Sequence, residues 1–399
     1  MIPRKRFDIG FNDIRHGFFS GFRSTNIGEL ESGIARFWGS HREVLPALSV
    51  RSGFDALLTA LNLECGSEVL VSALTIKDMA VILQEHGLIP VPVDLDLTRL
   101  NIDLCKLSTS VTPKTRAILV AHLFGSLVEM DEIVSFAEKQ ELLIIEDCAQ
   151  AFMGKPYRGH SKTDVSMFSF GPIKTASALG GAVLLFRDKT LFHKTRSIQN
   201  RWVRQRNWTF QKRALKYALL LILVHPRIYG LMFWLFQFLG FDPESIIHRL
   251  ARGFRRDSFF QCIRQRPSRA LLSLLARRLS SFSDHHLEER RRYGQMAASL
   301  LKDGRIPGAK ASLHTYWVFP YFSDRPKALI QYLKRHGFDA TQYQSSMGVI
   351  QPVAGKGEMP NEAQHAFDRM VYLPVYPEVG AHKIKILVQL INAFEHKMD

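Results

Sequence analysis

The stretch FSFGPIKTASALGGAV, residues 168–183, joins two apolar strand-like runs through a turn of small residues. Lys174 lies in that turn and is its only charged residue. Burial would disfavour the charged form of this amine, and a neutral amine is a nucleophile that attacks carbonyl carbons. The alternative to a nucleophilic lysine is one whose amine reaches solvent or pairs with an acid. Residues elsewhere in the chain must decide between the two.

The sequence on the N-terminal side of this stretch alternates between strand and helix patterns. Apolar strand-like runs are followed by amphipathic helical runs, with strands at 68–74, 89–96, 116–125 and 142–150 and helices at 76–87 and 129–141. This alternation predicts an α/β fold with a large, mostly parallel sheet covered on both faces. Ligands of such sheets bind beyond the carboxyl ends of the strands. Asp147 and Lys174 each follow a strand, so we expect them to converge there.

A lysine and an acid so placed fit the binding of pyridoxal 5'-phosphate, with the acid holding the pyridine nitrogen. A helix N-terminus would bind the phosphate, and SVRSGFDALLTAL (49–61) supplies a strand end, Ser52-Gly53 and then a helix. The structural alternative for Asp147 is a cap of the following helix.

The composition bounds the class of protein. The chain has 399 residues, 46% hydrophobic and 23% charged, which suits a globular protein of two or three domains. Residues from about 310 onward read as a smaller α+β domain. The four cysteines have no metal or disulfide spacing, and MIPRKRFDIGFND has no apolar run of a secretory signal. We therefore expect a cytoplasmic protein without a metal site.

Residues 214–241 form a strongly apolar stretch that His225-Pro226-Arg227 interrupts. Each half is too short to span a bilayer. Nine arginines and one acid follow between 249 and 278. We expect 213–278 to lie on an anionic membrane surface, at the inner face of the cytoplasmic membrane. A buried helical hairpin or a subunit contact is the alternative. The net charge of +16 also suits nucleic acid, but no nucleic-acid motif is present, so we expect no such partner.

An ordered set of segments resembles the DegT/DnrJ/EryC1/StrS family of fold type I pyridoxal-phosphate aminotransferases, most of which act on nucleotide-linked keto-sugars. The resemblance covers about 30–202 and 267–399. It implies a cofactor-binding domain at 1–204, an apolar and basic insertion at 205–262, and a helix leading to a small domain at 263–399. The segments that carry it are ELESGIARFWG (29–39), RSGFDALLTALNL, EVLVSALT, GLIPVPVDLD, VTPKTRAILVAHLFG, LLIIEDCAQAF, DVSMFSFGPIK, LGGAVLLF and RMVYLPVYPEV (369–379).

The resemblance also implies a role for individual residues. Lys174 matches the Schiff-base lysine, which also shuttles the proton, and Asp147 matches the acid on the pyridine nitrogen. A homodimer with a shared site is implied as well. The other matching positions are Gln150 at the cofactor ring, Ser169 with Ser52 and the N–H groups of Gly53 and Phe54 at the phosphate, and Asn200 at the partner subunit's phosphate.

Several positions depart from the family pattern. Phe54 replaces the usual threonine, Ile76 takes the place of the aromatic that stacks on the cofactor, and Phe152 stands where histidine is common. Lys77 and Asp78 stand where small residues are usual. In the substrate-facing loop 337–348 only Tyr343 lies near a usual substrate histidine.

The predicted function is amino transfer, with glutamate as donor, to a nucleotide-linked keto-sugar of surface glycan or antibiotic assembly. Family members with histidine in place of the lysine are dehydratases, and Lys174 argues against that branch. One alternative is a membrane-associated aminotransferase with a lipid-linked or lipid-like carbonyl acceptor. Another is a pseudoenzyme or membrane-anchored scaffold, which the departures at Phe54 and Ile76 motivate.

Overall fold

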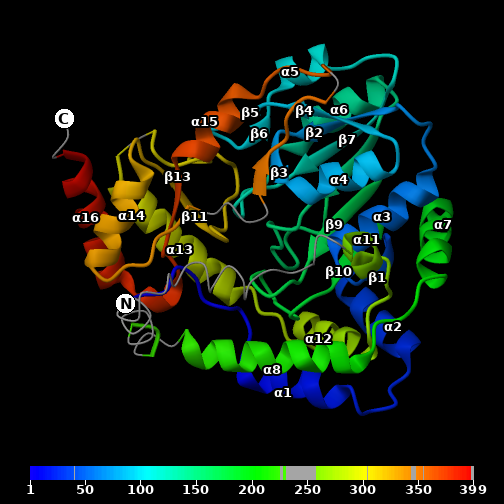
Figure 1. The fold of residues 1–399 in the computed structure, drawn as a ribbon, viewed down its shortest axis with the longest axis horizontal. Helices are drawn as coiled ribbons and strands as arrows, with labels where there is room; N and C mark the ends of the chain where they lie inside the picture. Colours follow the sequence, from blue (N-terminus) through cyan, green and yellow to red (C-terminus); the bar gives the residue numbers. More distant parts are fainter. Residues whose placement is uncertain are drawn as a thin grey trace.

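The computed structural model describes residues 1–39, 41–224, 228–230, 258–302, 304–342, 347–353 and 355–396. A seven-stranded sheet with the strand order β1-β10-β9-β8-β7-β2-β4 forms its centre. β10 runs antiparallel to both of its neighbours, and the other pairs of the sheet are parallel. The predicted α/β class with a mostly parallel sheet is thus confirmed (Figure 1).

The elements follow one another along the chain within these bounds. The strands are β1 Glu43–Ala47, β2 Glu68–Ser72, β3 Leu74–Ile76, β4 Ile89–Val93, β5 Leu95–Asp96, β6 Asn101–Ile102, β7 Thr115–Ala121, β8 Leu143–Asp147, β9 Val165–Ser169, β10 Ala182–Phe186, β11 Phe319–Phe322, β12 Met347–Val349 and β13 Met370–Leu373. The helices are α1 Phe11–Ser20, α2 Ile27–Trp38, α3 Val50–Leu61, α4 Lys77–Glu85, α5 Leu104–Thr109, α6 Met130–Lys139, α7 Lys189–Asn200, α8 Asn207–Leu223, α11 Phe259–Ile263, α12 Arg269–Ser280, α13 His285–Leu300, α14 Pro326–Arg335, α15 Asn361–Arg369, the 3₁₀ turn η2 Pro377–Val379 and α16 Ala381–His396.

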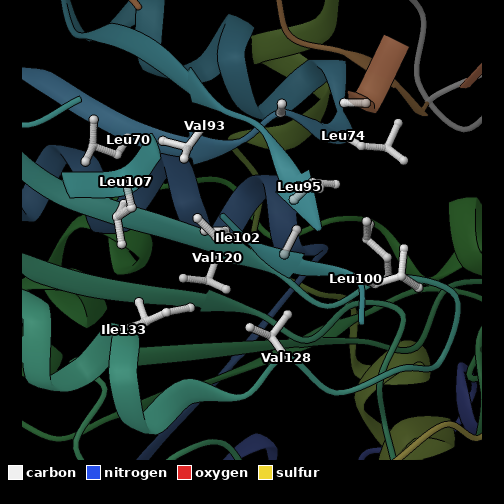
Figure 2. Packing of buried hydrophobic residues seen from close by; sticks show 14 of the residues in the cluster. Leu70, Leu74, Val93, Leu95, Leu100, Ile102, Leu107, Val120, Val128 and Ile133 are labelled. Carbon is white, nitrogen blue, oxygen red and sulfur yellow. The ribbon is translucent and has the colours of Figure 1, made fainter. Parts of the chain in front are cut away.

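The sheet is apolar on both faces because its strands are covered on both. In β7, Ile118 and Val120 belong to the core that includes Ile133 of α6, as Figure 2 shows for Val120 and Ile133. Ala117 and Leu119 point the other way and pack with residues of α3 and α4. Successive side chains of a strand alternate between faces, so a doubly covered strand reads as a continuous apolar run, as the sequence of β7 does.

The parallel register brings the carboxyl ends of β7, β8 and β9 to one edge of the sheet. Ala121 is paired with Asp147, and Asp147 is paired with Met167 of β9. The turn that carries Lys174 begins just after β9 and returns as β10. The sequence pattern therefore places the acid and the lysine at neighbouring strand ends.

A second apolar core lies in the C-terminal part of the chain. It packs the β11–β13 pair against helices α13, α14 and α16. The N-terminal segment belongs with this core, because Ile2 forms a bridge with Phe338 and contributes to the same cluster. α12 instead packs against α1 and α2 on the side of the large sheet. The predicted domain boundaries at 204 and 262 stay predictions.

The first half of the predicted apolar insertion is helical. α8 lies along α1 and α12 at one side of the molecule (Figure 1). Residues 231–241 of the stretch, together with 249–257 of the arginine-rich run, fall outside the described residues. Among the helices that the structure describes, none combines the length and hydropathy needed to cross a bilayer.

Gly294 of α13 offers a test of this packing. A Cβ at this position would lie 2.2 Å from Cδ2 of the buried Tyr316 ring. We expect Gly294→Ala to lower the free energy of unfolding by about 1–3 kcal/mol through overpacking, less the gain in helix propensity of about 0.5–1 kcal/mol. Gly33→Ala in α2 is the control, because its nearest neighbour would be an ordinary 3.6 Å away. Urea denaturation should show the control unchanged or stabilised, and equal behaviour of both variants would contradict the packing.

Candidate active site

Lys174 is held at the sheet edge by a tight, hydrogen-bonded turn. Its amide donates to the Gly171 carbonyl, and Ala178 and Gly180 both donate to the Phe170 carbonyl. The Nζ of Lys174 lies 4.1 Å from the centre of the Trp317 ring, whose indole N–H donates to the Ile173 carbonyl. The amine of Lys174 therefore lies over the face of the Trp317 ring.

Burial dominates the electrostatics of this amine. It lowers the pKa of Lys174 to about 7, with repulsion from Arg51 adding to the decrease and attraction to Asp147 opposing it. At neutral pH a large share of the amine is uncharged. Lys174 thus has the protonation state that a carbonyl-capturing nucleophile requires.

Asp147 is the last residue of β8 and is buried. Burial raises the pKa of its carboxyl, while a hydrogen bond from the Ala149 N–H at 2.9 Å and attraction to Lys174 counteract part of the increase. The structure therefore brings the two predicted residues into electrostatic contact. The Asp147 carboxylate is also poorly solvated, and a cationic ring N–H would stabilise its charge there.

Glu146, the residue before Asp147, faces the opposite side of the strand and sits in a dense network of donors. His122 Nε2 lies 2.9 Å from its carboxylate, Ser166 Oγ 2.6 Å, and the hydroxyl of Tyr157 also donates to it. The Val128 N–H donates to Nδ1 of His122, so the proton of the neutral ring is on Nε2. These bonds lower the pKa of Glu146 to about 2 despite its burial. The network fixes the end of β8, and nothing in the linear sequence pattern indicated it.

The predicted phosphate turn is more enclosed than the sequence suggested. α3 begins at Val50, since Ser49 caps it by accepting from the Ser52 N–H. The Gly53 N–H already donates to the Ser49 carbonyl at 3.0 Å, and the Ser52 hydroxyl donates to Ile263. The Phe54 side chain is fully buried in the core. A phosphate bound by the Gly53 N–H would have to displace a helical hydrogen bond.

Two polar side chains remain at that end of the site. Ser169 closes β9 and is half-buried. Arg51, in the first turn of α3, pairs with Asp78 of α4 and interacts electrostatically with both Lys174 and Asp147. Arg51 was not among the residues predicted from the sequence, although a cation next to Ser52-Gly53 at a helix N-terminus is a usable signal.

The remaining predicted residues fall in three places. The Gln150 amide oxygen accepts from the Phe124 N–H, and its amide nitrogen lies 3.5 Å from the sulfur of Met347. Ile76 precedes α4 and is paired with the same Met347 across β3 and β12. Asn200 is exposed at the end of α7. Tyr343 lies outside the described residues.

A large doubly covered sheet with a half-buried lysine and a buried aspartate at its carboxyl edge defines the class of fold type I pyridoxal-phosphate enzymes. A sequence model described as the DegT/DnrJ/EryC1/StrS aminotransferase family matches residues 15–219. The chain belongs to this family.

Individual relatives agree with this assignment. The chain is 27% identical to the pleiotropic regulatory protein of Geobacillus stearothermophilus, over 92% of this chain and 89% of that protein. It is 35% identical to the GDP-perosamine synthase of Caulobacter vibrioides, over 43% of this chain and 47% of that protein. A crystal structure of NtdA from Bacillus subtilis with bound cofactor PMP has the same fold, with a TM-score of 0.68 at 18% identity, covering 96% of this chain and 83% of that one.

The residues present fit pyridoxal phosphate. The Lys174 amine with its lowered pKa suits the aldehyde, and the buried Asp147 carboxylate suits the pyridine nitrogen. The cation Arg51 at the start of α3 suits the phosphate.

The pKa of Lys174 predicts how the cofactor-free protein takes up pyridoxal phosphate. Only the neutral amine attacks the aldehyde, and with a pKa of about 7 the neutral share rises as pH increases through that value. We expect the capture rate to rise about tenfold per pH unit below pH 7 and to level off above about pH 8. Stopped-flow absorbance would measure it. A rate that still climbs through pH 9 would show an ordinary, solvated lysine.

Proposed function

We propose that this protein transfers an amino group from glutamate to the keto group of a nucleotide-linked sugar. The half-buried, largely neutral amine of Lys174, attracted to the buried carboxylate of Asp147, carries the proposal. The likeness to GDP-perosamine synthase, over 43% of this chain, supports an activated sugar as the acceptor.

Each residue has a distinct task in this reaction. Lys174 would bind the cofactor through its Nζ and, once displaced by a substrate amine, move the proton of the carbon undergoing amination. Asp147 would keep the pyridine nitrogen protonated. The bound cofactor supplies an electron sink for that proton removal. Gln150 and Ile76 would position the ring. Ser169 and Arg51 would hold the phosphate at the start of α3, where Ser52, Gly53 and Phe54 would take part once the helical hydrogen bond of the Gly53 N–H is displaced.

The alternative of a pseudoenzyme or anchored scaffold has less support. A buried amine without a covalent or ionic role destabilises a fold, because its charged form is poorly solvated there. Lys174 is half-buried, Asp147 is buried, and the two attract each other electrostatically, although Phe54 and Ile76 depart from the family pattern. A scaffold would have no use for that pair.

The proposal extends to a homodimer in which the exposed Asn200 of one subunit reaches the phosphate in the other. The exposure of Asn200 at the end of α7 supports this arrangement.

We further propose that α1 and α8 form a membrane-facing surface on the inner side of the cytoplasmic membrane. Apolar side chains are exposed along both helices and are accompanied by Arg15, Lys212 and Lys216, while α8 contains no acid. Such a surface suits anionic lipid head groups. The exposed apolar residues are Phe11, Phe19, Phe22, Trp208, Leu215, Leu219 and Ile222.

Amination assays would test the catalytic proposal. With L-glutamate and a panel of nucleotide-linked and polyprenyl-linked keto-sugars, we expect the protein to aminate a nucleotide-linked member. Lys174→Ala should lower the rate by about 10²–10⁴-fold, the range of a lost acid–base group, and should abolish the borohydride-reducible cofactor linkage. Lys162→Ala, at an exposed lysine paired with Glu138, is the matched control. Retention of the reducible linkage in Lys174→Ala would refute the assignment, and activity on the polyprenyl-linked compounds alone would favour a lipid-linked acceptor.

Vesicle flotation would test the membrane surface. We expect the protein to float with anionic vesicles and much less with neutral ones, and the double variant Leu219→Gln and Ile222→Gln to weaken flotation at least several-fold. Met359→Gln is a suitable control, because Met359 is 59% exposed, like Leu219 at 58%, but lies far from α8 in the sequence. Equal flotation of all variants would exclude this surface. Loss of self-association in the double variant, measured by sedimentation, would identify the face as a subunit contact instead.

A further inference from the structure

The N-terminal segment of the chain places a second lysine, Lys5, with a buried amine, at the site. The Nζ of Lys5 lies 3.7 Å from the centre of the Trp317 ring, the same ring that Lys174 approaches to 4.1 Å. The two amines are therefore no farther apart than the sum of those distances. Burial lowers the pKa of Lys5 well below its usual range, and repulsion from Lys174 and Arg290 lowers it further.

Arg290 of α13 adds a guanidinium to the same place. Its Nε donates to the Thr315 carbonyl at 2.8 Å and its Nη1 to the hydroxyl of Thr175, the residue after Lys174. These two bonds fix the plane of the group. Among the residues that the structure describes, Nη2 of Arg290 and Nζ of Lys5 are both buried without a hydrogen-bond partner.

The acids that attract these two cations are bonded to other groups. Glu378, which attracts Arg290, pairs with Arg6. Asp8 interacts with both electrostatically, but one carboxylate oxygen accepts from the Ala176 N–H and the other from Arg278. Unpaired buried cations are costly unless an anion joins them. Two such donors converging beside a reactive lysine therefore indicate a site for an anionic group of a ligand.

We propose that Lys5 and Arg290 bind the α-carboxylate of the amino-acid donor, an inference that rests on the proposed function. The carboxylate of an α-amino acid is attached to the carbon that bears the reacting amine, so it must lie close to Lys174 Nζ when the amine exchanges there. The diphosphate of a nucleotide sugar is separated from its keto group by the sugar ring. An arginine held by two of its nitrogens, with a lysine beside it, suits a carboxylate.

In this arrangement, the substrates of the two half-reactions are recognised by different residues of the site. The donor is recognised through its charge by the N-terminal segment and α13. A keto-sugar carries no anion on the carbon next to its carbonyl, so it gains nothing from Lys5 at that point. Lys5 is accordingly a binding residue for the first half-reaction. No sequence pattern predicted a role for the segment PRKRF (3–7), which contains it.

Stopped-flow measurement of the first half-reaction, on the cofactor-loaded protein, tests the site. Lys5→Met keeps the length of the side chain, removes the charge and breaks no hydrogen bond, so the variant should fold at least as stably as the unmodified protein. We expect its apparent Kd for L-glutamate to rise about 10–100-fold, as loss of a bond to a charged group implies. L-glutamine and L-alanine should be affected equally, because they share the α-carboxylate. Arg6→Gln is the control, since Arg6 belongs to the same segment but is 59% exposed.

The outcomes separate the two proposals. Calorimetry with glutarate, which has carboxylates but no amine, should show binding to the unmodified protein and at least tenfold weaker binding to Lys5→Met. No reaction of the unmodified protein with any amino acid would overturn the proposed function itself. A normal reaction with unchanged Kd values in Lys5→Met would overturn the anion site alone. Weaker binding of the cofactor, with unchanged donor Kd, would assign Lys5 to the cofactor phosphate instead.

Discussion

The partial loss of water from the amine of Lys174 at the sheet edge is the constraint on which the rest of the site depends. Burial lowers the pKa of this lysine to about 7 and raises that of Asp147, so each group is held in a state that water would reverse. Their attraction offsets only part of the desolvation cost, because buried ion pairs seldom recover all of it. The sheet maintains the pair because parallel strands deliver their carboxyl ends to one covered edge.

Two adjacent acids on β8 show how local surroundings separate structural from chemical roles. Glu146 and Asp147 are both buried, yet several donors lower the pKa of Glu146 to about 2, whereas Asp147 has few donors and its pKa is raised. Alternation along the strand explains the difference, because it sends the two side chains to opposite faces. The well-bonded acid holds the strand end in place, and the poorly bonded one is left with capacity for a ligand.

The features that could be predicted from the sequence are those that depend on local periodicity. Apolar runs and their spacing predicted the large sheet, and the positions of Asp147 and Lys174 after strands predicted their convergence. The phosphate turn stays a prediction; the cap at Ser49 starts α3 before Ser52-Gly53 and uses the Gly53 N–H within the helix, which the pattern did not indicate. Trp317, Lys5 and Arg290 could not be found by pattern, since tertiary packing alone brings these three distant segments together.

The N-terminal segment contacts both the C-terminal core and the apolar insertion. Arg4 pairs with Asp339 of the C-terminal core, and the hydroxyl of Tyr229, which follows α8, donates to the same carboxylate at 2.6 Å. The residue next to Arg4 is Lys5, whose amine reaches Trp317. A contact from the apolar insertion thus helps to position the segment that brings Lys5 to the site. Because Asp339 is fully buried and shared by both partners, displacement of either one leaves an underpaired carboxylate, and the segment is held by the fold as a whole rather than by local structure.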